Sequence, residues 1–134
     1  MNLPKANYIG VFGTIEPDDD IPAPTGDGAF CDSKSVSFVQ LRRGLSHTII
    51  VGERKMATVP ATWLGVSYSG EDAACRLVGS AIKSPNCDQC DECEFTSRHQ
   101  GGANFLWADG HVRMIAESIN TNTYQQMARR GSEY

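Results

Sequence analysis

The sequence lacks features that would place it in two common classes of protein. No run of its 134 residues approaches the roughly 20 apolar residues that a membrane-spanning helix needs. Residues 1–5 also lack the apolar segment of a signal peptide. Basic residues are few, with 12 Lys and Arg against 16 Asp and Glu, and pairs such as Arg42-Arg43 and Arg129-Arg130 are too short for a nucleic-acid surface. We therefore expect no membrane segment in this chain and no nucleic-acid partner.

The sequence also lacks the short motifs of common catalytic sites. It has no Gly-x-Ser-x-Gly elbow, and Gly101-Gly102 is not followed by the Lys-Ser/Thr of a phosphate-binding loop. Ser46 and His47 are neighbours at the start of an expected strand, where successive side chains point to opposite faces. We therefore expect no catalytic residues and no enzyme activity.

The composition indicates an ordinary globular chain. Hydrophobic residues make up 40% of the sequence and charged residues 21%, which separates it from disordered chains. A length of 134 residues is typical of one domain with a modest core. We expect residues 1–134 to form a single globular domain.

The strongest local signal is Asp109-Gly110, which stands between two apolar runs. Such a dipeptide is typical of a two-residue β-hairpin turn, in which both residues take positive φ. It predicts a hairpin over residues 103–115 with the pairs Ala108–His111, Trp107–Val112, Leu106–Arg113 and Phe105–Met114.

This register predicts two different faces, because side chains alternate across a strand. The face buried on the core would consist of Phe105, Trp107, Val112 and Met114. The other face would be mixed, formed by Asn104, Leu106, His111 and Arg113. Leu106 and Arg113 are then candidates for a contact surface.

Other segments predict a strand-rich fold. Alternating or β-branched runs favour strands at 8–12, 35–38, 47–53, 61–68 and 76–82, with 47–53 as the buried central strand and a turn or short helix at 40–46. Capping residues in Ile119–Thr123 favour a last helix, with Tyr124, Met127 and Ala128 on one stripe and Gly131 at its end. The expected class is α+β: a mostly antiparallel sheet with a short C-terminal helix.

Five cysteines, Cys31, Cys75, Cys87, Cys90 and Cys93, leave two interpretations open. The steps Cys87-x2-Cys90-x2-Cys93 could bring thiolates onto one zinc ion, with His99, Cys75 or Cys31 as the fourth ligand. Disulfides of an exported domain are favoured over zinc, and the simplest pattern joins Cys31 to Cys75 and makes one bond within 87–93. The sequence alone does not fix the pairing.

The acidic loop that follows Glu16 suggests calcium as a further ligand. Carboxylates of Asp18, Asp20 and Asp27 are of the type that hard cations take. The loop lacks the Gly and the bidentate Glu of an EF-hand, so a solvated surface loop is the preferred interpretation.

His99, nine further residues and then Asp109-Gly110 resemble the His-x9-Asp-Gly signature of the prepilin-type C-terminal domain. That domain closes the type II secretion pseudopilin-like family, a large set of bacterial proteins of unknown function. Residues 7–13, 26–30, 44–53, 62–66 and 76–80 agree with the family in order, although His47 replaces its usual Asn. Family members usually begin with a prepilin leader and a hydrophobic helix, and this chain is similar to the part that follows them.

The resemblance implies a structural or assembly protein, not an enzyme. Its partners would be proteins, through self-assembly or contacts with secretion or pilus-type subunits, at an extracytoplasmic site. The alternative is a small zinc module on Cys87, Cys90 and Cys93. Within the motif, His99 precedes the first hairpin strand and Asp109 lies at its far end, roughly 17 Å away. We therefore expect His99 to bond loop backbone and not Asp109.

Overall fold

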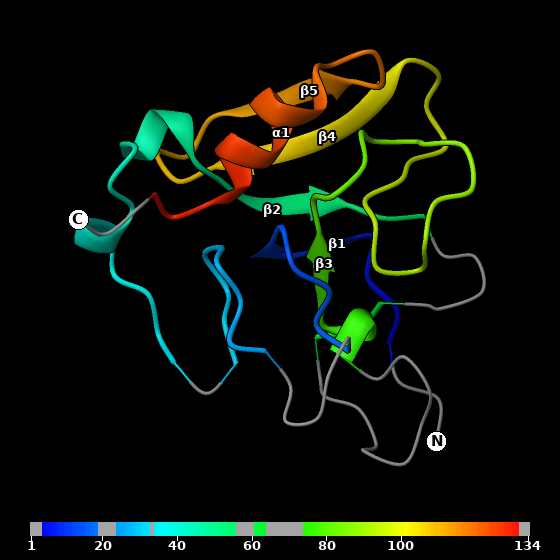
Figure 1. Ribbon diagram of the computed structural model, residues 1–134. Helices are drawn as coiled ribbons and strands as arrows, with labels where there is room; N and C mark the ends of the chain where they lie inside the picture. Colours follow the sequence, from blue (N-terminus) through cyan, green and yellow to red (C-terminus); the bar gives the residue numbers. More distant parts are fainter. Residues whose placement is uncertain (1–3, 19–23, 33, 56–60, 64–73, 132–134) are drawn as a thin grey trace.

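The computed structural model describes residues 4–18, 24–32, 34–55, 61–63 and 74–131, whose strands form one five-stranded sheet (Figure 1). The strands are β1 (Tyr8–Gly13), β2 (Ile49–Glu53), β3 (Val78–Ser80), β4 (Gly102–Trp107) and β5 (Val112–Ala116). Their spatial order is β3-β1-β2-β4-β5. β1 and β3 run parallel, and the other three pairings are antiparallel. With the short helix α1 (Thr121–Ala128), this arrangement confirms the expected α+β class.

The segments that connect the strands contain three short 3-10 helices, η1 (Phe38–Gln40), η2 (Leu45–His47) and η3 (Ala74–Arg76). The strand expected at 35–38 is wrong, because the Ser37 N–H donates to the Gln40 side chain at 2.8 Å and favours the turn η1. The strands predicted at 8–12, 47–53 and 76–82 correspond to β1, β2 and β3, and β2 is the central strand. Most of 61–68 lies outside the described residues.

The hairpin exists, but its register differs by one residue from the prediction. Leu106 pairs with Val112, Asn104 with Met114 and Ala103 with Ile115. The Trp107 N–H donates to the His111 carbonyl at 2.9 Å, which leaves a loop of three residues, 108–110. Gly110 has φ +95°, whereas Asp109 does not take positive φ. This is a three-residue hairpin loop with glycine in the left-handed position, not the predicted two-residue loop.

A shift of one residue reverses the faces of β5. Ile115 is 4% exposed and lies on the core, whereas Val112 is 63% and Met114 is 53% exposed. The prediction that Val112 and Met114 share the buried face with Phe105 and Trp107 is therefore wrong. On β4 the prediction holds, since Phe105 and Trp107 are both buried.

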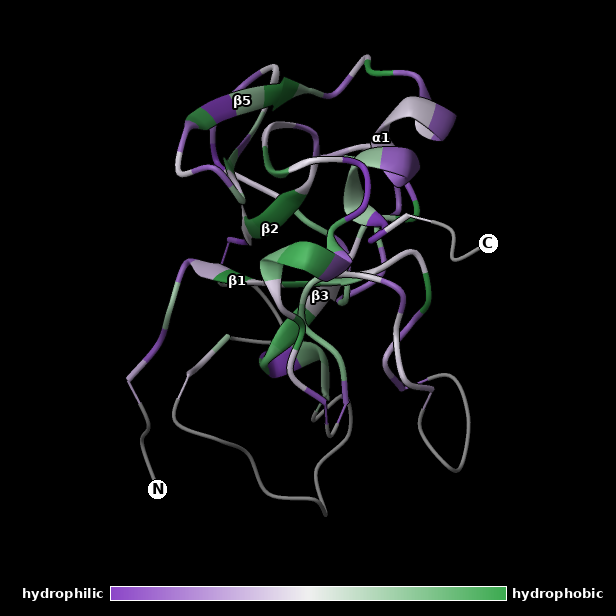
Figure 2. Cartoon of the chain, turned by 90° about the vertical axis from the view of Figure 1, so that its left-hand side faces the viewer, coloured by the Kyte–Doolittle hydropathy of each residue, from purple (hydrophilic) through white to green (hydrophobic). Residues whose placement is uncertain are grey.

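The core lies on the side of the sheet that α1 covers (Figures 1 and 2). Phe105 makes edge-to-face contacts with Phe95, at 5.2 Å between ring centroids, and with Tyr124 of α1, at 5.9 Å. Such pairs add to the free energy gained from burial of the rings. The Tyr124 hydroxyl is buried and has no hydrogen-bond partner among the described residues.

Helix α1 begins as the sequence predicts. The Asn120 side chain accepts a hydrogen bond from the Thr123 N–H at 3.2 Å, which satisfies one free amide of the first turn. Tyr124 and Ala128 are buried, and Met127 packs against the core. The predicted apolar stripe thus attaches the helix to the sheet.

The register makes a testable prediction about stability. Ile115→Ala should lower the free energy of unfolding by about 2–4 kcal/mol, because it leaves a cavity in the core. Met114→Ala, the matched control on the next residue, should change it by about 0.5 kcal/mol or less. Urea unfolding followed by fluorescence measures both, and the opposite order would indicate the two-residue turn.

Candidate interaction site

Glu53 ends β2 and holds the start of β4 through its side chain. The pairing of β2 with β4 ends just before Glu53, at the pair Gly52–Phe105. One carboxylate oxygen, Oε2, accepts the Asn104 N–H at 3.0 Å, and the other, Oε1, lies 3.0 Å from His99 Nε2. The Glu53 carboxylate therefore takes the place of a main-chain acceptor where the strands separate, and it fixes His99.

The other end of the same segment is attached to the beginning of β2. The Ala108 N–H donates to the Thr48 carbonyl at 2.9 Å, and the Asp109 N–H donates to the Leu45 carbonyl at 3.1 Å. His99 and Asp109-Gly110 thus stand at the two ends of β4, and each end is bonded to the region of β2. This explains physically why their spacing matches the length of a strand.

His99 and Asp109 have different partners, as expected from their separation. Asp109 Oδ1 lies 2.5 Å from His111 Nδ1 and accepts the His111 N–H at 3.1 Å. These hydrogen bonds lower the pKa of Asp109 below its usual range. The His99 ring contacts the Glu53 carboxylate and not loop backbone, which corrects the prediction for its side chain.

Asn86 and Ser97 support the backbone of His99. The Asn86 side-chain amide donates to the His99 carbonyl at 3.2 Å and to Ser97 Oγ at 3.1 Å, and Asn86 Oδ1 accepts the Ser97 N–H at 2.6 Å. The Ser97 hydroxyl donates a hydrogen bond to the Gly102 carbonyl at 2.5 Å. Asn86 has φ +57°, a conformation that asparagine tolerates better than most residues. Sequence analysis missed Asn86. The available signal was the residue type, because asparagine is common where the backbone takes positive φ.

Arg54, which sequence analysis also missed, joins β2 to the cysteine-containing segments. Its guanidinium is buried and donates to three carbonyls, those of Cys75, Cys93 and Glu94. Burial lowers the pKa of Arg54 to about 10, an effect that the nearby carboxylates of Glu94, Glu92 and Asp91 oppose. Arg54 therefore remains charged at neutral pH. The signal that could have indicated Arg54 is its place in the charged pair Glu53-Arg54, directly after a β-branched run.

The cysteines form two disulfides, Cys75–Cys93 and Cys87–Cys90, and Cys31 is a free thiol. One bond within 87–93 agrees with the expectation, whereas the expected Cys31–Cys75 bond is wrong. The neighbour of the Cys31 sulfur is Arg130, whose Nη1 lies 2.8 Å away. The zinc hypothesis for Cys87, Cys90, Cys93 and His99 applies only to a reduced form and stays a prediction.

Asp18 and Asp27, the two calcium-ligand candidates that the structure describes, have different contact partners. Asp27 accepts hydrogen bonds from the Thr14 N–H at 2.7 Å and the Thr14 hydroxyl at 2.6 Å, and it lies 3.4 Å from Arg129. Asp18 Oδ1 lies 3.8 Å from Cys93 Sγ instead. Asp20 lies outside the described residues.

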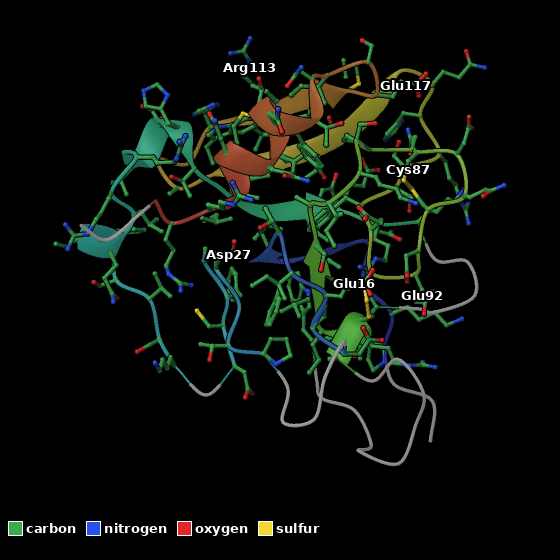
Figure 3. All side chains as sticks on the ribbon, viewed as in Figure 1. Glu16, Asp27, Cys87, Glu92, Arg113 and Glu117 are labelled. Atoms are coloured by element: carbon green, nitrogen blue, oxygen red, sulfur yellow. A yellow bond between two sulfur atoms is a disulfide. The ribbon has the colours of Figure 1, made fainter. Side chains whose placement is uncertain are left out.

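A polar cavity of about 860 Å³ lies beside His99 and the Cys87–Cys90 loop. Figure 3 shows Cys87 and Glu92 in the loops on this side of the molecule, with Glu117 above them. The lining of the cavity includes Arg54, Asn86, Glu94 and Ser97. Each of these makes protein hydrogen bonds, so in this cavity they position backbone.

Glu94, in the lining of this cavity, is a buried carboxylate. Both of its oxygens lie 3.2 Å from the Lys83 N–H. Burial raises the pKa of Glu94 to about 7, and this main-chain hydrogen bond only partly offsets the effect. Burial and then the Glu94 charge raise the pKa of Tyr124 well above its usual value.

The second feature is the sheet face opposite α1, here called the open sheet face. Its first row runs across four strands: Phe30 packs over Gly10 of β1, Gly10 pairs with Val51, Val51 with Leu106, and Leu106 with Val112. Its second row begins at Tyr8 of β1 and ends at Met114 of β5, and it contains Glu53 and Asn104 between them.

The first row of the open sheet face is apolar, and the residues at the edges of the face are accessible. Phe30 is 46% exposed, Tyr8 is 40% exposed, and Val112 and Met114 are more exposed still. Figure 2 shows α1 on one side of the strands, so this helix does not cover the other side. A contiguous patch of this kind is typical of a protein contact surface.

Comparison with known proteins identifies a family. A family model described as a protein of unknown function (DUF1559) matches residues 2–122. No curated protein and no solved structure matches the chain. Among the described residues, no helix has the length and apolar character needed to cross a membrane.

The two partners of the Glu53 carboxylate should contribute unequally to stability. Glu53→Ala should cost about 1–3 kcal/mol of unfolding free energy, because the Asn104 N–H loses its acceptor. His99→Ala should cost less than about 1 kcal/mol, since its side chain is 55% exposed and its ion pair is screened by solvent. Chemical unfolding measures both values. An equal or larger cost for His99→Ala would contradict this account of the site.

Glu94 should make stability depend on pH. Its pKa is about 7 in the folded state and 4.5 for the free side chain, so the folded state holds a proton that the unfolded state has lost between these values. This stabilisation is complete below pH 4.5 and is lost as the pH rises through about 7. Glu94→Gln should therefore gain stability relative to the wild type, by up to about 3 kcal/mol, between pH 5 and pH 8. Thermal unfolding at both pH values measures the difference, and parallel pH curves would contradict it.

Proposed function

The chain belongs to the protein family of unknown function DUF1559, and from this premise we propose that it is a non-enzymatic assembly protein that acts through protein–protein contacts. In this proposal it works like the globular head of a pseudopilin-like subunit, which its His99 and Asp109-Gly110 spacing resembles. The partner is another subunit of the same kind. The observation that carries the proposal is the open sheet face.

The dimensions of the open sheet face suit a protein partner. Its row from Phe30 to Val112 crosses three spacings between strands, or roughly 14 Å, which is wider than a single helix. Apart from Gly10, the residues of this row have large apolar side chains, and those closest to its centre, Val51 and Leu106, are half-buried. A partner that covers the face would gain free energy from burial without first unfolding any described element.

The polar features favour a structural role for the rest of the chain. Glu53, Asn86 and Ser97, the polar groups around His99, each form hydrogen bonds with backbone groups. The two disulfides are typical of an oxidising compartment, which supports an extracytoplasmic site such as the periplasm or the cell surface.

The test replaces apolar groups on the open sheet face without altering the strand. Val112→Thr with Met114→Gln should reduce self-association, measured by sedimentation over a concentration series, because both residues are exposed and contribute little to the core. The matched control is Val39→Thr with Phe38→Gln, two exposed apolar residues of η1 outside the sheet.

The expected result is a wild type and a control that associate equally, and a β5 variant at least fivefold weaker, a loss of about 1 kcal/mol. Unfolding curves of all three proteins verify that they are folded. A wild type that stays monomeric throughout, or a β5 variant that associates as the wild type does, would overturn the proposal.

A further inference from the structure

A second surface lies on the α1 side of the sheet, at the end where the hairpin turns. It is a groove of about 580 Å³, here called the basic groove. Its lining contains two arginines, Arg43 and Arg113, and two histidines, His47 and His111. Trp107 and Met127 supply its apolar surface.

The register of the hairpin brings these groups together. Arg113 pairs with Phe105, so its side chain lies on the face of the sheet that α1 covers. Figure 3 shows Arg113 beside β5 and α1, away from Cys87 and Glu92. Trp107 and His111 stack across the turn, with ring centroids 4.7 Å apart and planes at 17°. Arg43 and His47 come from the segment around η2, which is bonded to the turn through the Leu45 carbonyl.

Every polar side chain of the groove can donate a hydrogen bond. Besides these two arginines and two histidines, the lining contains Ser46, Thr123 and Gln126, and no carboxylate occurs among its described residues. The neighbouring carboxylate, Asp109, is already bonded to His111. In a chain of net charge −4, this concentration of donors favours an anionic ligand.

Two arginines that directly follow α1 have side-chain partners, unlike Arg43 and Arg113. Arg129 lies 3.4 Å from the Asp27 carboxylate, and Arg130 donates to the carbonyls of Gly26 and Gly28. Within the described ranges, Arg43 and Arg113 make no ion pair or side-chain hydrogen bond. Their guanidinium groups therefore remain available, and guanidinium binds carboxylates with two parallel hydrogen bonds.

We propose that the basic groove binds an acidic segment of a partner protein, with Arg43 and Arg113 each bonded to a carboxylate. The inference rests on the proposed function, because it names a chemical feature of the partner in a protein–protein contact. The volume of the groove exceeds that of a single small anion and suits several side chains of a peptide. Trp107 and Met127 would contact the methylene groups of glutamate side chains.

The test measures binding of a fluorescent hexaglutamate peptide to the folded chain by anisotropy, with hexalysine as the control peptide. The variant is Arg43→Gln with Arg113→Gln. The matched control is Lys34→Gln with Arg98→Gln, which removes the same charge from two exposed residues outside the groove. All four substituted residues are exposed, so each protein should remain folded, as an unfolding curve verifies.

The wild type and the control should bind hexaglutamate, and the groove variant should bind it roughly fivefold or more weakly. Binding should weaken as NaCl rises, and hexalysine should not bind. Three results would overturn the inference: no binding by the wild type, equal loss in both variants, or displacement of the peptide by inorganic phosphate at equal concentration. Because the assay uses no second subunit, its failure leaves the self-association measured through the open sheet face unaffected, and the two outcomes are distinguishable.

Discussion

The three-residue turn at 108–110 is the constraint on which the rest of the structure depends. Gly110 supplies the positive φ that this turn requires, and the turn sets which residues of β5 meet which residues of β4. Side chains alternate along a strand, so the turn also decides which of them reach the core. Ile115 faces the core, Val112 and Met114 face outward, and Arg113 lies on the side of α1. Both proposed contact surfaces follow from this choice.

The hairpin could not hold this position alone, because an isolated pair of strands is marginally stable in water. One end of the hairpin is attached to the central strand through the Glu53 carboxylate, and the other end is attached to the segment before that strand through the carbonyls of Leu45 and Thr48. The open sheet face and the basic groove are thus two sides of one supported hairpin. If the proposed function holds, a subunit with contact surfaces on two sides can meet two neighbours, which is the geometry that extended assemblies require.

The sequence predicts much of this fold, because its strongest signals are local. The β-branched run at 47–53, the Asn120 cap and the Asp109-Gly110 turn each favour one element, and each element occurs near its expected place. The register could not be predicted, since Asp-Gly fits both a two-residue loop and a three-residue loop with Gly110 in the left-handed position. Contacts between residues far apart in sequence, such as Glu53 with His99 or Arg54 with Cys75, leave no periodic trace in the sequence.

The central claim is therefore about register, and nuclear Overhauser effects between backbone protons of β4 and β5 measure it directly. The account predicts cross-strand effects that join Leu106 to Val112 and Asn104 to Met114. Effects that join Trp107 to Val112 and Phe105 to Met114 instead would contradict it. In that case Val112 and Met114 would belong to the core, and neither contact surface would exist as described.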